Sequence, residues 1–220
     1  MNLKTRNALV SLAGALYPAA GKSSNDWGHI SAVVAQGSAM TTQVKGRELN
    51  KAELAALLLH DVAVAPFGGE KKHHAERSGI CAYMMLSSSG LFTEEEARAV
   101  GLAISLHDEK ELEKETSLAD LLAAADFSPM DIVYIVGKSY GKNLKQVKCP
   151  LTAAVKTAAY VSKAYGSKSK RLFPRIYQRY YGEQIPETAA VADTLTPAQV
   201  LEFAAEFARR PKPPCLEIPA

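Results

Sequence analysis

Hydrophobic positions follow the period of an α-helix almost throughout this chain, and no stretch of useful length alternates apolar and polar residues as a strand does. Several helix starts carry the polar residues that cap a first turn. The predicted caps are Ser24 or Asn25, Asn50 with Glu53, and Thr93 with Glu96. The pattern therefore predicts an all-α fold.

Three of the predicted helices have no polar face, and each runs directly into histidine or aspartate. A helix that is apolar all round is buried, and a polar group at its end costs several kcal/mol unless it has a partner. Neutral imidazole and ionised carboxylate are usual ligands of Zn, Mn and Fe, so a shared metal site would satisfy all three helix ends. The three are residues 54–59 before His60 and Asp61, residues 100–106 before His107, and residues 121–125 before Asp126.

The histidines are unevenly distributed, which strengthens the metal interpretation. All five, His29, His60, His73, His74 and His107, lie in the first half of the chain. Each one alone is explained by packing or by a hydrogen bond to the backbone. Together with two carboxylates at buried helix ends, they favour a metal site.

The order of the segments DWGHI, LLLHDV, HHAERSG, ISLHD and LAAADF resembles the HD superfamily of metal-dependent phosphohydrolases. The resemblance covers residues 24 to about 135 and implies an HD-domain helical bundle that holds two divalent transition-metal ions (Fe, Mn, Co or Zn). It implies one ion held by a first His, a His-Asp pair and a late Asp, and a second recruited by two further histidines. Matched in that order, these ligands are His29, His60 with Asp61, Asp126, and then His74 and His107.

Two positions bear on how closely this chain follows the family pattern. His74 is preferred to His73 because Ala75 and Ser78 then fit the family pattern. Many hydrolases of the family carry a lysine shortly after the His-Asp pair, where this chain has Val64.

The resemblance implies a reaction class and leaves alternatives open. A phosphohydrolase of a nucleotide or other small phosphate ester ranks first, with Asp61 bridging the ions and Arg77, one turn after His74, facing the substrate. The same ligands also serve mixed-valent diiron oxygenases, and Val64 favours this second reading. A nuclease or nucleic-acid binder ranks third.

A strongly basic stretch distinguishes the second half of the chain from the first. Residues 132–182 contain eleven Lys and Arg, no Asp or Glu, and seven of the nine tyrosines. An anionic partner suits such a stretch. We predict a metal-binding core at residues 1–141 and, at 142–220, a basic C-terminal helical lobe packed on the same domain. The cations predicted to bind substrate are Lys138, Lys142, Arg171 and Arg175.

The remaining features predict a cytoplasmic protein. Lys4 and Arg6 before the apolar residues 8–20 loosely resemble a signal peptide, but Gly14 and Pro18 favour an amphipathic first helix. The three cysteines are widely spaced, which argues against a disulfide framework. No apolar run is long enough to span a bilayer.

Overall fold

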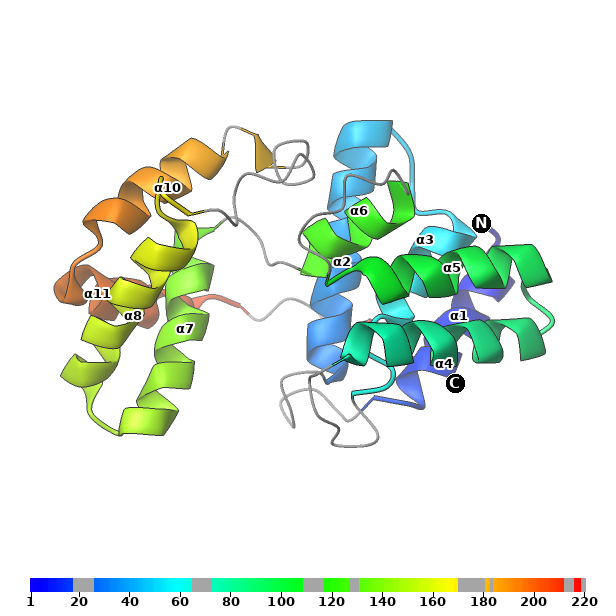
Figure 1. The fold of residues 1–220 in the computed structure, drawn as a ribbon, viewed down its shortest axis with the longest axis horizontal. Coiled ribbons are helices and arrows are strands. Elements are labelled where there is room, and N and C mark those ends of the chain that lie inside the picture. The colour runs from blue at the N-terminus through cyan, green and yellow to red at the C-terminus, as the bar shows by residue number, and fades with distance from the viewer. Residues whose placement is uncertain are drawn as a thin grey trace. The chain divides into compact units, whose positions relative to one another are not determined.

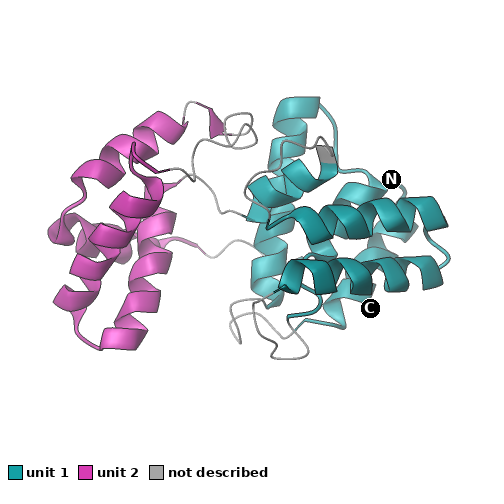
Figure 2. Ribbon diagram, viewed as in Figure 1, with its two compact units in different colours: residues 1–127, 213–220 teal, residues 128–212 magenta. Residues whose placement is uncertain are grey.

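The structure, a computed structural model, describes residues 1–17, 26–64, 73–108, 117–126, 131–169, 181–182, 184–211 and 216–218. Within these residues it contains ten α-helices and no strand, so the predicted all-α fold is confirmed (Figure 1). The chain forms two compact units, coloured separately in Figure 2. One comprises Met1–Phe127 and Pro213–Ala220, and the other comprises Ser128–Lys212.

The first unit is built around its third helix. Its helices are α1 (Leu3–Gly14), α2 (Trp27–Lys45), α3 (Lys51–Leu59), α4 (His74–Ser88), α5 (Glu94–Leu106) and α6 (Ser117–Asp126). Helix α3 packs against α1, α2, α5 and α6. The side chains from Leu54 to Leu59 are at most 3% exposed, which confirms that this helix is buried on every side.

A buried carboxylate stabilises the start of α3. The predicted capping box is present: Asn50 Oδ1 accepts a hydrogen bond from the Glu53 backbone, and Glu53 Oε2 accepts one from the Asn50 backbone. Glu53 is only 3% exposed, and it also pairs with Lys45 at 2.7 Å and with Arg47 at 2.7 and 2.8 Å. Burial alone would raise the pKa of Glu53, but these hydrogen bonds lower it to about 2. Glu53 therefore remains an anion at neutral pH.

The N-cap of helix α2 lies one residue after Asn25 and two after Ser24, the two predicted caps. Asp26 is the N-cap, and its Oδ1 accepts hydrogen bonds from the backbone of Gly28 at 2.9 Å and of His29 at 3.1 Å. The prediction of Ser24 or Asn25 as the cap is therefore wrong, and both lie outside the described residues. Aspartate caps as well as serine or asparagine and also adds a charge that favours the helix N-terminus.

The end of the chain is anchored to α2. The indole Nε1 of Trp27 donates a hydrogen bond to the carbonyl oxygen of Leu216 at 2.8 Å. The backbone N–H of Leu216 donates in turn to Ser31 Oγ at 3.0 Å. A segment that follows the second unit in the sequence thus belongs to the first unit in space.

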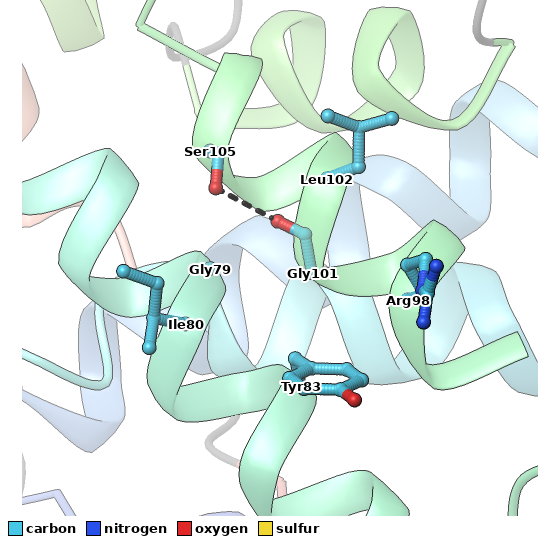
Figure 3. A pocket seen from close by; sticks show the side chains of 7 residues that line it. All are labelled: Gly79, Ile80, Tyr83, Arg98, Gly101, Leu102 and Ser105. Atoms are coloured by element: carbon cyan, nitrogen blue, oxygen red, sulfur yellow. Dashed lines mark hydrogen bonds between the residues drawn. The ribbon is translucent and has the colours of Figure 1, made fainter. Parts of the chain in front are cut away.

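Helices α4 and α5 lie side by side and approach closely where both carry glycine (Figure 3). A Cβ atom added at Gly79 would lie 2.4 Å from the Gly101 carbonyl oxygen and 2.0 Å from Ser105 Oγ. Ser105 Oγ already donates a hydrogen bond to the Gly101 carbonyl at 3.0 Å. The crossing therefore requires residues without side chains.

One side of α5 is not buried, contrary to the prediction for residues 100–106. Leu102 is 52% exposed and, with Gly79 and Gly101, lines a hollow of about 330 Å³ beside the crossing (Figure 3). The opposite side carries Val100 and Ile104, which are fully buried. Helix α5 is therefore half-buried, with an apolar side chain exposed on one side and two fully buried on the other.

The second unit contains α7 (Ile132–Val147), α8 (Pro150–Tyr165), α10 (Gln184–Thr194) and α11 (Pro197–Arg209). Helix α8 packs against the other three, and α7 also packs against α11. The composition boundary predicted at residues 141 and 142 falls inside the uninterrupted α7, whereas the compact units divide before it.

The glycine crossing generates a testable prediction. Gly79→Ala should lower the free energy of unfolding by about 1–3 kcal/mol, because the new methyl group meets backbone atoms of α5. Gly141→Ala in α7, where a Cβ meets no atom within 4 Å, is the matched control and should gain about 0.5–1 kcal/mol from helix propensity. Calorimetric unfolding of both variants measures the difference. Equal stability of the two would contradict the close packing.

Candidate metal centre

Six side chains from five helices converge within the first unit. His60 and Asp61 directly follow α3, and His107 directly follows α5. The others come from helix termini as well: His29 in the first turn of α2, His74 at the start of α4 and Asp126 at the end of α6. They form two groups that could each hold a metal ion. The groups are His29 with His60 and Asp126, and Asp61 with His74 and His107.

The first group is a tight cluster of nitrogen and oxygen atoms. His29 Nε2 lies 3.2 Å from His60 Nε2 and 3.2 Å from Asp126 Oδ1. His60 Nε2 lies 3.5 Å from the same Asp126 oxygen. Two atoms bound to one transition ion at about 2.1 Å are themselves about 3.0–3.4 Å apart at right or tetrahedral angles. The cluster therefore has nearly the spacing that a common ion requires.

Asp61 lies between the two groups with one oxygen toward each. Its Oδ2 is 3.6 Å from His29 Nε2 and 3.5 Å from His60 Nε2. Its Oδ1 is 3.4 Å from His74 Nε2. Because the residue is only 3% exposed, a water shell cannot satisfy this charge. The geometry is that of a carboxylate able to bridge two ions.

The second group contains a buried nitrogen that has no hydrogen-bond partner among the described residues. His107 Nδ1 donates to the Ile104 carbonyl at 2.6 Å, which leaves Nε2 without its proton and buried. The ring stands at 84° to that of His74, with the centroids 5.3 Å apart. An unpartnered imidazole nitrogen beside a carboxylate fits a metal ligand.

The surroundings of the site raise the pKa of some of its groups and lower the pKa of others. Burial lowers the pKa of His29, but the hydrogen bonds and charges of Asp126 and Asp61 outweigh burial and raise it to about 9. Burial likewise opposes ionisation of Asp61, yet the charge of His60 and the hydrogen bond from His29 lower its pKa to about 2. Burial and the charge of His60 lower the pKa of His107. His107 is therefore in the neutral form that binds metals.

The other predicted site residues are found in several places. Arg77 is exposed on α4 and lines a hollow of about 280 Å³ with Ala63, Ile80 and Cys81. His73 is exposed and lies 3.3 Å from Glu76, outside both groups.

The cations predicted to bind substrate belong to the second half of the chain. Lys138 and Lys142 are exposed on α7 in the second unit, and Lys138 lies over the Tyr134 ring. Arg171 and Arg175 lie outside the described residues.

Two residues near the centre were not assigned from the sequence. Tyr17 is 6% exposed, and burial together with the charge of Asp61 raises its pKa well above the ordinary value. Asp108 has Oδ2 3.4 Å from His74 Nδ1. An acidic residue directly after a ligand-type histidine could have pointed to Asp108, whereas no sequence pattern pointed to Tyr17.

Comparisons with protein-family models, with curated proteins and with solved structures find no match for this chain. Among the described helices, none has the length and apolar character needed to cross a membrane.

The raised pKa of His29 predicts how metal binding depends on pH. The ring must lose a proton to bind an ion, so affinity should rise about tenfold per pH unit between pH 7 and 8. In the metal-free protein, the stability that protonated His29 contributes is complete below pH 6.5 and is lost as the pH rises through about 9. Calorimetric titration with Mn²⁺ at several pH values tests the predicted pH dependence of the metal affinity. An affinity independent of pH would contradict it.

Two adjacent histidines allow a matched test of the second group. His74→Ala should weaken retention of one ion, because it removes the nitrogen that faces Asp61 Oδ1. His73→Ala, at an exposed position outside both groups, should leave metal content unchanged. Elemental analysis after dialysis compares the metal content of the two variants. The reverse result would assign the ligand to His73 and not to His74.

Proposed function

We propose that this protein is a metal-dependent phosphohydrolase of the HD type, acting on a nucleotide or another small phosphate ester through two metal ions. One observation carries the proposal: the two oxygens of buried Asp61 face different histidine groups. A carboxylate that serves a single ion has no need of a second set of imidazoles. The shared carboxylate, together with the segment order that resembles the HD superfamily, supports a dinuclear centre.

Two divalent ions held at such a centre would lower the pKa of a bound water molecule and would draw charge from the phosphoryl oxygens. The chain's own groups hold and orient this arrangement. His29, His60 and Asp126 would hold one ion, and His74, His107 and Asp61 would hold the other, with the second oxygen of Asp61 facing the first group. The depressed pKa of Asp61 keeps its carboxylate ionised at any pH at which the enzyme would work.

Arg77 is the cation of the first unit best suited to a substrate phosphate. It lines the hollow of about 280 Å³ together with Ala63, which is only two residues after Asp61. The other lining residues, Ile80 and Cys81, are weakly polar. A guanidinium in such a lining suits a ligand with an anionic end and a less polar body. The predicted roles of Lys138, Lys142, Arg171 and Arg175, which belong to the second unit, stay predictions from the sequence.

A mixed-valent diiron oxygenase is the second candidate, because the same ligand set serves iron and oxygen. The observation in its favour is Val64, which occupies the place where many hydrolases of the HD superfamily carry lysine. The acid-free basic stretch favours a nuclease as the third candidate.

One experiment separates the three reactions. The protein loaded with Mn²⁺ or Co²⁺ and kept free of oxygen should release phosphate or a nucleotide product from a panel of nucleotides. Asp61→Asn, which removes the bridging charge, should reduce turnover by several orders of magnitude. Turnover that requires ferrous iron and consumes oxygen, without cleavage of any phosphate ester, would overturn the hydrolase in favour of the oxygenase. Cleavage of single-stranded nucleic acid alone would favour the nuclease.

A further inference from the structure

The ring nitrogens that face away from the centre reveal how its histidines are oriented. His60 and His107 each donate Nδ1–H to a carbonyl three residues earlier, at 2.9 Å from Leu57 and at 2.6 Å from Ile104. Both histidines sit at the C-terminal end of a helix, where the last carbonyl groups lack helical partners. The local backbone therefore directs the Nε2 atoms of both rings into the centre.

His74 cannot be oriented in this way, because it is the first residue of α4. The N-terminus of a helix offers free N–H groups and no spare carbonyl. The ring still presents Nε2 to Asp61 Oδ1 at 3.4 Å, so an acceptor for Nδ1–H has to come from outside the first turn of α4 if the ring is to be fixed in this orientation. Asp108 Oδ2 faces Nδ1 at 3.4 Å and is placed to accept this hydrogen bond.

We propose that Asp108 is a positioning residue, which holds His74 with Nε2 toward Asp61 and so sets the affinity of the second metal position alone. The inference rests on the proposed dinuclear function. A carboxylate behind a ligand imidazole fixes its tautomer and orientation and increases its basicity, and its loss lowers metal affinity about 10- to 100-fold. Because Asp108 directly follows His107, one dipeptide supplies a ligand and the support for another ligand.

The first group should not depend on Asp108. Its three side chains are within 3.2–3.5 Å of one another, whereas Asp108 contacts His74, which belongs to the other group. The Asp108 side chain is 61% exposed, so replacing it should not disturb packing. A selective loss at one of two positions is a signature that general destabilisation would not produce.

The experiment is a calorimetric titration of the metal-free, full-length protein with Mn²⁺, combined with the absorption spectrum of the Co²⁺ form. The wild type should bind two ions. Asp108→Ala should bind the first ion unchanged and the second about 10- to 100-fold more weakly, with loss of only part of the Co²⁺ spectrum. Asp108→Asn should recover part of this affinity, because its amide oxygen still accepts Nδ1–H. Glu76→Ala is the control, since Glu76 is a similarly exposed carboxylate that faces His73, and it should bind both ions normally.

The outcomes separate the inference from the proposed function. If the wild type binds two ions and Asp108→Ala binds both of them equally well, the proposed role of Asp108 is overturned and the dinuclear centre is not. Equal weakening of both ions, or no recovery in Asp108→Asn, would also overturn it. A wild type that binds fewer than two ions would overturn the proposed function itself, and this inference with it.

Discussion

The charge of Asp61 is the constraint around which the first unit is organised. An ionised carboxylate that is 3% exposed, at the end of a helix without a polar face, costs several kcal/mol unless nearby groups compensate it. His29, His60 and His74 each bring a ring nitrogen to within 3.6 Å of it. Four further helices therefore have to end or begin near the end of α3, and this requirement shapes the bundle.

At the opposite end of α3, ion pairs compensate the charge of another buried carboxylate. Glu53 is equally buried, but Lys45 and Arg47 reach it with their long side chains, and both are partly exposed to water. Both carboxylate oxygens of Glu53 have hydrogen-bond partners. At the Asp61 end, by contrast, Nε2 of His107 lies in the group with the carboxylate and has no hydrogen-bond partner in the described part of the chain. The difference marks one end of the helix as structural and the other as a candidate for binding.

Helix polarity explains why ligand-type side chains need different supports. A histidine at a helix C-terminus finds an acceptor in its own last turn, as His60 and His107 do. A histidine at an N-terminus is fixed by other means: the Asp26 cap holds the backbone of His29, and Asp108 faces the ring of His74. The glycine crossing of α4 and α5 keeps His74 and His107 on neighbouring elements.

Much of this arrangement could be predicted from the sequence because it depends on local pattern. The apolar run before His60, the capping box at Asn50 and the order of the six ligand-type residues are readable from neighbours in the chain. The same information did not predict the exposure of Leu102, the proximity of Tyr17 to Asp61, the anchoring of Leu216 on α2 or the contact between Asp108 and His74. Each of these depends on residues that are distant in sequence and meet only when helices pack. Helical periodicity determines which side of a helix is apolar, but it does not specify which neighbour covers that side or how closely the two backbones approach.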